Sequence, residues 1–264
     1  MVIRHIPFFV LASALALAGQ TPTQNQQFAE TRSETRAQSP IPASDPRQVI
    51  TPEIRADIMM ARKMFREAID MYKQAPQDSA IVQNKIGIAY HQLVEMGTAK
   101  KFYQKASKMK PEYAEAINNL GTVHYAQKNY RKAIGYYKKA LLHSPASASI
   151  HSNLGTAYFA RRNYDMALEE YQVAMKLDPD VFEHRGSHGV LLQERSVDER
   201  AKFHFYLAKS YAKAGNSDRA LLYLRKALEE GFKEKKRILE EPDFAFIRES
   251  AEFKQLLAME QKVI

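Results

Sequence analysis

The chain has 264 residues, is 45% apolar and 26% charged, and carries a formal net charge of +9. It has no cysteine, which excludes disulfide bonds, thiol catalysis and cysteine-ligated metals. The positive charge favours acidic partners, anionic lipid or nucleic acid. The lysines and arginines are spread along the chain, however, and no nucleic-acid-binding motif accompanies them, so we expect no nucleic-acid partner.

The first 18 residues have the pattern of a secretory signal peptide. Arg4 precedes an apolar stretch from Ile6 to Ala18, which ends in the small-x-small sequence "ALA" typical of a cleavage site. The stretch is too short to cross a hydrocarbon core of about 30 Å as a helix. We therefore expect export to a periplasm or the exterior, with no transmembrane helix after signal removal; an uncleaved anchor or a buried helix is the alternative. Gln20 stands where a lipoprotein signal needs cysteine, so no lipid anchor is expected there.

Residues 19–48 are predicted to be a disordered linker. They are rich in Gln, Thr, Ser, Pro and Ala, and Phe28 is their lone aromatic residue. Such a composition buries too little apolar surface to offset the entropy lost on ordering.

Residues 49–79 are predicted to be a degenerate helical unit. Thr51 before Pro52 is typical of a helix start, because Thr caps the first turn and Pro tolerates its first position. The stretch "MFREAIDMYKQAP" contains the Ala-Tyr-Ala spacing that recurs further along the chain. No Gly, Asn or Asp separates the two halves, so a weak hairpin and one continuous helix both remain open.

Residues 80–181 contain three copies of a pattern with a period of 34 residues. The recurring residues are Gly87, Ala99, Tyr103, Ala106 and Pro111, then Gly121, Ala133, Tyr137, Ala140 and Pro145, then Gly155, Ala167, Tyr171, Ala174 and Pro179. Within the middle copy, two apolar faces with helical spacing are separated by a turn near Asn129, and Pro145 ends the unit. The pattern predicts a helical hairpin. A side chain larger than Gly121 where the helices cross would cost roughly 1–3 kcal/mol through overpacking.

These copies resemble tetratricopeptide repeats, whose pattern is Leu-Gly, Tyr, Ala, an aromatic residue, Ala and Pro. The copies span residues 80–113, 114–147 and 148–181, and His124 replaces the first aromatic residue in the second copy. The resemblance implies an all-α fold, a right-handed α-solenoid of stacked hairpins. The sequence also has no Gly-rich phosphate loop, GxSxG turn or plausible catalytic triad, so we expect a non-enzymatic protein that needs no cofactor.

The remainder of the chain is predicted to continue and close this stack. Residues 182–200 form an expected insertion loop; His184 and His188 in it are four apart, but Gly186 between them argues against a metal site. Residues 201–234 fit a further hairpin, preceded by a capping box from Ser196 to Glu199. Residues 235–264 are expected to form short helices that cap the open end.

In this family, ligand-contacting residues lie on the first helix of each hairpin and line a concave groove, and the resemblance carries that role over here. The implied groove residues are Asn84, Ile88, His91, Asn118, Asn119, Thr122, Tyr125, Ser152, Asn153, Thr156, Phe159, Phe205 and Lys209, and Lys202 maps beside them. Asn119 and Asn153 share one repeat position, and Asn84 lies one residue early, so a ladder of asparagines would be imperfect. Their amides suit either a peptide backbone or a neighbouring helix. His124 and His151 are expected to be packing residues.

The sequence therefore predicts an exported scaffold or adaptor protein, whose groove binds a peptide segment of a partner protein. Its positive charge would speed encounter with an acidic partner. The alternative is a basic binder of the cell-envelope surface, held to anionic lipid or polymer by charge, with a structural role.

Overall fold

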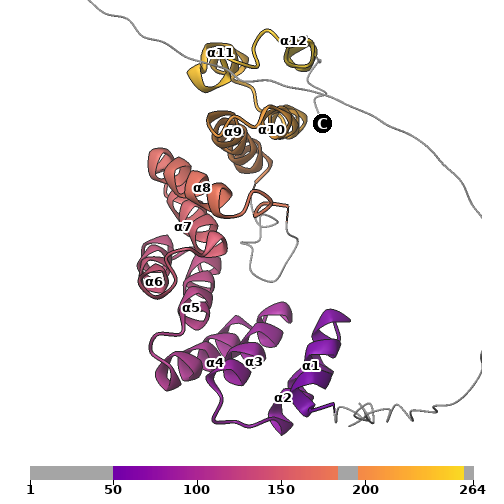
Figure 1. The fold of residues 1–264 in the computed structure, drawn as a ribbon, viewed down its shortest axis with the longest axis vertical. Helices are drawn as coiled ribbons and strands as arrows, with labels where there is room; N and C mark the ends of the chain where they lie inside the picture. Colours follow the sequence, from indigo (N-terminus) through magenta and orange to yellow (C-terminus); the bar gives the residue numbers. More distant parts are fainter. Residues whose placement is uncertain (1–49, 184–195, 259–264) are drawn as a thin grey trace, which may run out of the picture. The chain divides into compact units, whose positions relative to one another are not determined.

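A computed structural model describes residues 50–183 and 196–258, all of which belong to a unit spanning residues 49–264 (Figure 1). The expected signal peptide, the expected linker and most of the expected insertion loop lie outside these residues. Every regular element in the described ranges is a helix. The helices are α1 (Pro52–Ala61), α2 (Phe65–Gln74), α3 (Ala80–Gln92), α4 (Met96–Met109), α5 (Ala114–Ala126), α6 (Tyr130–His143), α7 (Ala148–Ala160), α8 (Tyr164–Leu177), α9 (Val197–Lys213), α10 (Ser217–Glu229), α11 (Lys235–Glu240), η2 (Pro242–Phe244) and α12 (Ala251–Ala258).

Consecutive helices pair into hairpins, and each hairpin packs against the next one along the chain. The pairs are α1 with α2, α3 with α4, α5 with α6, α7 with α8, and α9 with α10 (Figure 1). The predicted all-α stack of hairpins is therefore confirmed. Of the two possibilities left open for residues 49–79, the structure has the hairpin, because Arg62 to Met64 separate α1 from α2.

Each hairpin turn contains one residue in the left-handed backbone region. These residues are Lys63, Val94, Lys128, Arg162 and Gly215, with φ between 58° and 75°. Only glycine adopts this conformation without a steric cost. At the turn named in the sequence, the Asn129 side chain accepts a hydrogen bond from the backbone N–H of Lys132 at 3.4 Å and so caps α6.

A glycine opposite a tyrosine ring brings the two helices of each central hairpin together. A Cβ atom placed on Gly87, Gly121 or Gly155 would lie 2.6 Å from the ring of Tyr103, Tyr137 or Tyr171, respectively. The three rings are buried. The α9–α10 hairpin has Ala208 and Leu224 at the equivalent positions, and both are fully buried. The larger Ala208 in place of glycine is matched there by Leu224, which is smaller than tyrosine.

The C-terminal helices cover the last hairpin, as a solenoid end requires. Phe205 of α9 stacks on Phe232 with ring centroids 4.5 Å apart and meets Phe244 of η2 edge-on at 5.9 Å. Phe253 and Leu256 of α12 are buried in the same cluster. Ser196 accepts from the backbone N–H of Glu199 at 3.3 Å, so α9 begins at Val197, ahead of the expected repeat boundary at residue 201.

Within residues 50–183 and 196–258, no helix is both long and apolar enough to span a membrane.

Candidate functional site

The asparagines of the implied groove join neighbouring hairpins to each other. Asn119 Nδ2 donates to Asn84 Oδ1 at 3.0 Å, and Asn153 Nδ2 donates to Asn118 Oδ1 at the same distance. All four side chains are buried. Asn84 and Asn118 therefore share an acceptor position, and the donors lie one residue further along in the following repeat. The apparent misalignment of Asn84 in the sequence reflects two alternating positions rather than a defective ladder.

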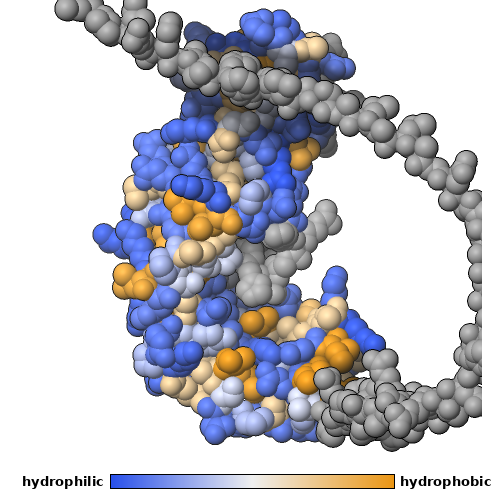
Figure 2. Space-filling view, in the orientation of Figure 1, coloured by the Kyte–Doolittle hydropathy of each residue, from blue (hydrophilic) through white to orange (hydrophobic). Residues whose placement is uncertain are grey.

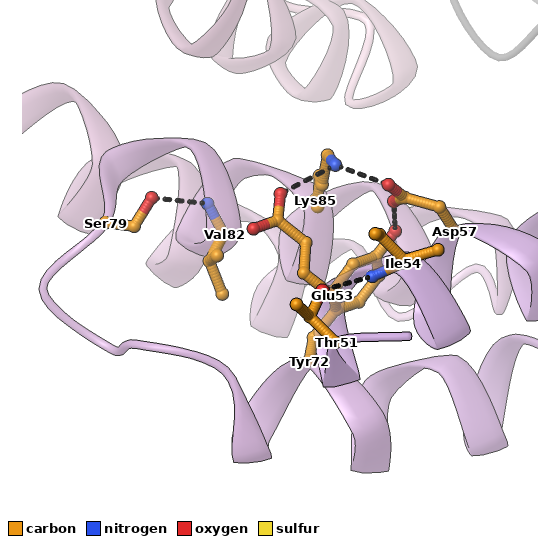
Figure 3. Close-up of polar contacts among 8 residues, drawn as sticks. All are labelled: Thr51, Glu53, Ile54, Asp57, Tyr72, Ser79, Val82 and Lys85. Carbon is orange, nitrogen blue, oxygen red and sulfur yellow. Dashed lines mark hydrogen bonds and ion pairs between the residues drawn. The ribbon is translucent and has the colours of Figure 1, made fainter. Parts of the chain in front are cut away.

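Lys85 of α3 occupies the same repeat position as the donors Asn119 and Asn153, and it also contacts the preceding hairpin, α1–α2. Its Nζ lies 2.8 Å from Glu53 Oε1 and 2.8 Å from Asp57 Oδ2, both on α1 (Figure 3). Partial burial alone would lower the pKa of Lys85, but hydrogen bonds to Asp57 and Glu53 raise it above its ordinary value. The Tyr72 hydroxyl also donates to Asp57, at 2.5 Å. Lys85, Asn119 and Asn153 therefore hold the same repeat position, and each of them bonds to the hairpin that precedes its own.

The two threonines of the implied groove bond within their own hairpins. Thr122 Oγ1 accepts from the Tyr137 hydroxyl, and Thr156 Oγ1 accepts from the Tyr171 hydroxyl, both at 3.3 Å. Burial raises the pKa of Tyr137, so its hydroxyl keeps its proton as donor. These contacts fix the tyrosine rings that lie against the helix-crossing glycines.

Ile88, His91 and Ser152 are at least half buried at the positions that the resemblance gave them. His91 Nδ1 lies 3.3 Å from the Tyr103 hydroxyl, and burial lowers the pKa of His91. Ser152 donates to the backbone carbonyl of Ser149 at 3.0 Å.

Phe205 and Lys209 do not line an open groove, which corrects this part of the expectation. Phe205 is completely buried, and Lys209 Nζ lies 2.9 Å from Glu241 Oε2 beside η2. The C-terminal helices dock on this end of α9 and cover both side chains. The family pattern placed these residues without accounting for the segment that follows the last hairpin.

Tyr125, Phe159 and Lys202 come together from three different hairpins. They line a cavity of about 400 Å³. The complete lining is Tyr125, Ala126, Lys128, Tyr130, Phe159, Ala160, Arg162, Tyr164, Glu199 and Lys202. We call this the turn pocket, because most of its lining comes from the turns and adjoining helix ends of the α5–α6 and α7–α8 hairpins. Of the implied groove residues at this pocket, Tyr125 is partly exposed and Lys202 is exposed, whereas Phe159 is only 5% exposed.

Aromatic rings form one wall of the turn pocket. The ring centroids of Tyr125 and Tyr130 are 5.2 Å apart, and those of Phe159 and Tyr164 are 5.3 Å apart. Tyr206 of α9 stacks on Tyr164 at 4.5 Å and meets Phe159 edge-on at 5.7 Å. Tyr206 thus packs against two rings of the preceding hairpin, and these contacts restrain that part of the wall.

Cations outnumber acids around the turn pocket. Lys128, Arg162 and Lys202 line it, against one carboxylate, Glu199. None of the three cations forms an ion pair with another residue in the part of the chain that the structure describes. Lys128 and Arg162 hold the same left-handed turn position in adjacent hairpins, which places both at one edge of the stack. The arrangement suits a carboxylate next to an apolar or aromatic group.

Sequence reasoning missed the turn residues of this pocket. Lys128 and Arg162, like Tyr130 and Tyr164, are 34 residues apart and so follow the repeat period. Basic and aromatic residues that recur at the hairpin turns were the available signal.

The two histidines of the repeats pack as expected. His124 is buried and stacks on Tyr136 at 5.2 Å; burial, followed by the charges of Lys100 and Lys132, lowers its pKa. His151 Nδ1 lies 2.7 Å from Glu170, and its Nε2 lies 3.0 Å from the carbonyl of Pro145. No cluster of three metal-ligating side chains occurs among the described residues, and His184 and His188 lie outside them.

Comparison with known proteins agrees with the repeat pattern. Three tetratricopeptide-repeat models match the chain, over residues 80–113, 112–180 and 204–230. No curated protein matches it. Among solved structures, a crystal structure of MamA is 22% identical, with a TM-score of 0.45, and the match covers 69% of this chain and 96% of that chain. MamA from Desulfovibrio magneticus RS-1 is 20% identical, with a TM-score of 0.46 and coverages of 69% and 94%. Likeness at this level carries no functional argument.

Proposed function

We propose that this chain, whose central hairpins are tetratricopeptide repeats, is an interaction scaffold that holds an acidic segment of a partner protein at the turn pocket. Stacked helical repeats serve in general as extended binding surfaces. The observation that carries the finer proposal is the combination of the partly exposed rings of Tyr125, Tyr130 and Tyr164 with three cations around one cavity. The partner segment would place a carboxylate among the cations and an apolar or aromatic side chain against the rings.

The size and chemistry of the turn pocket support this occupant. A cavity of about 400 Å³ lies within the ~300–1,000 Å³ range of ligand pockets and has room for one or two side chains. Aromatic faces offer large contact areas with little rotamer entropy to lose. A carboxylate gains charge-assisted hydrogen bonds from lysine and arginine. Because helices hold the lining in place, association carries a small ordering cost.

The asparagines play a supporting part in this proposal. Their side-chain amides bond from hairpin to hairpin, so they stabilise the stack that positions the turn pocket. A role in gripping a peptide backbone would require these buried bonds to open. The proposal therefore assigns ligand contact to the aromatic and basic side chains of the pocket.

Peptide binding tests the proposal directly. An array of immobilised 12-residue peptides, varied in acidic and aromatic content, would be probed with the purified chain. We expect peptides that combine a carboxylate with an aromatic residue to bind best. Lys202→Glu should weaken them about tenfold, equivalent to about 1.4 kcal/mol. Lys139→Glu makes the same charge change on an exposed site of α6, outside the pocket, and should have little effect. Equal losses in both variants, or no preference for acidic peptides, would reject the turn pocket as the site.

Binding to an anionic surface is a second candidate, which the net charge of +9 favours. Sedimentation with phosphatidylglycerol vesicles distinguishes it from pocket docking. Attraction by net charge alone should collapse between low and moderate salt and should be insensitive to Tyr125→Ala. Pocket docking should be lost in Tyr125→Ala.

Export to a periplasm or the exterior is also part of the proposal, supported by the pattern of residues 1–18. Edman sequencing of the protein recovered from the expressing cells should find an N-terminus immediately after Ala18. An N-terminus at Met1 would contradict cleavage.

A further inference from the structure

The first helix of the stack exposes a face that every later hairpin buries. Aligned on the tyrosines Tyr72 and Tyr103, Ile58 of α1 corresponds to Ala89 of α3. Ala89 is fully buried, as are Val123 and Ala157 at the same position of the next two hairpins, but Ile58 is 41% exposed. Ile54, one turn earlier, is 45% exposed. Figure 2 shows hydrophobic surface over the end of the molecule where Figure 1 places α1.

A cation lies beside these two isoleucines. Arg55 aligns with Ile86, Leu120 and Leu154, which are core residues in the later hairpins. Its side chain is exposed and forms no ion pair with any described residue. We call Ile54, Arg55 and Ile58 the end face. Its neighbours Glu53 and Asp57 are already engaged by Lys85, as Figure 3 shows, so Arg55 is the charge on this face that has no partner there.

We propose that the end face is a second docking surface, and that it takes an amphipathic helix of a partner protein carrying a carboxylate beside its apolar stripe. Each later first helix uses the equivalent face to pack on the hairpin before it: α3 on α2, α5 on α4, and α7 on α6. The shape of the face therefore fits a helix. Covering Arg55 without an opposite charge would be costly, so the partner must supply an acid.

Two other occupants fit the face less well. Residues 19–48, which precede α1, have Phe28 as their lone aromatic and contain no helical stripe of apolar residues. A second copy would meet the end face with its own, because the opposite end of the stack is covered by η2 and α12. A two-fold contact brings the same surface of both copies together, so it would set Arg55 near its symmetry mate. Like charges in a buried contact are unfavourable.

Selection of helices on the full chain tests this proposal. A yeast-displayed library of 18-residue helices would keep an Ile/Leu stripe and vary the flanking positions among Glu, Gln and Lys. Helices selected on the wild-type chain should carry Glu at one flanking position. Arg55→Glu should weaken them at least tenfold, and replacing that Glu with Lys should restore binding to the variant. Arg66→Glu, the same change at an exposed site of α2, should stay within twofold of wild type.

Three results would overturn the proposal. Selected helices with no preference for Glu, or with equal affinity for the wild-type and Arg55→Glu chains, would show that the partner helix needs no carboxylate. A concentration-dependent dimer in sedimentation, dissolved by Ile58→Ser, would assign the face to a second copy. A photo-crosslinker at position 54 that captures residues 19–48 of its own chain would assign it to the preceding segment.

Discussion

Replacing Gly121 with alanine tests the close approach of α5 and α6. The added Cβ would lie 2.6 Å and 2.7 Å from two ring carbons of Tyr137, and 3.2 Å from the Cβ of Tyr136. Favourable carbon contacts occur at about 3.5–4.0 Å. The Tyr137 ring is fully buried and its hydroxyl is bonded to Thr122, so it has no open space into which to move. The helices must separate instead.

The magnitude follows from two opposing effects. Overpacking of a core costs about 1–3 kcal/mol. Alanine is preferred over glycine inside a helix by about 1 kcal/mol, which offsets part of that cost. The first hairpin has Ala56 opposite Tyr72, so a hairpin can accommodate this pair by adjusting its helices. We therefore expect Gly121→Ala to lower the free energy of unfolding by about 1 kcal/mol.

Gly135→Ala is the matched control on α6. No atom lies within 4 Å of a Cβ placed there, so only the helix preference acts, and stability should rise by about 1 kcal/mol. Urea unfolding followed by far-UV circular dichroism would measure both variants. Their difference isolates the steric cost and should be about 2 kcal/mol. Equal stabilisation by both substitutions would refute the close-approach reasoning.

A double-mutant cycle adds a second test of the same contact. The α9–α10 hairpin has Ala208 with Leu224 where the three central hairpins have glycine with tyrosine. Combining Gly121→Ala with Tyr137→Leu copies that pair. The steric cost should largely disappear in the double variant, giving a favourable coupling of about 1 kcal/mol. Additive effects would show that the two residues do not share a contact.

Three further substitutions test the turns, the asparagine contacts and the buried histidine. Val94→Gly should raise the free energy of unfolding by about 1 kcal/mol in urea titration, because Val94 is β-branched and has a φ of 62°; an unchanged or lower stability would contradict backbone strain. Asn119→Ala should lower it by about 1–3 kcal/mol by leaving the buried Oδ1 of Asn84 without its donor, whereas the exposed Gln104→Ala should change it little. His124 has a pKa lowered below 6.5, so below pH 6.5 the unfolded chain binds more protons and stability falls on acidification. His124→Tyr should lose less stability than wild type between pH 7 and pH 5 in thermal unfolding; identical losses would exclude a contribution from His124.

The repeat architecture was readable from the sequence because it depends on local regularities. Glycine, alanine and tyrosine at fixed offsets set where two adjacent helices touch, and Pro145 together with Asn129 marks where they stop. Such features act within one hairpin of about 34 residues and reappear in the next. The helix start at Ser196 was readable for the same reason, since a cap involves residues three apart.

The partners of the groove residues were not readable in this way. Asn84 and Asn119 meet across two hairpins, and their pairing depends on how one hairpin is rotated on the next. The sequence therefore left open whether these amides bind a peptide backbone or a neighbouring helix, and the structure has the buried bonds between helices. Phe205 was predicted to line the groove for a similar reason. The repeat pattern does not predict where the non-repeating C-terminal segment packs, and in the structure that segment covers Phe205.

The turn pocket and the end face also depend on how separate hairpins are arranged, which the sequence pattern does not predict. Tyr125, Phe159 and Lys202 belong to three hairpins, and Arg55 matters because α1 has no described hairpin before it. Periodicity of side chains along one helix fixes which of its faces is apolar. Which other element covers that face, or leaves it open, follows from the free energy of packing the whole stack, to which residues far apart in the chain contribute together.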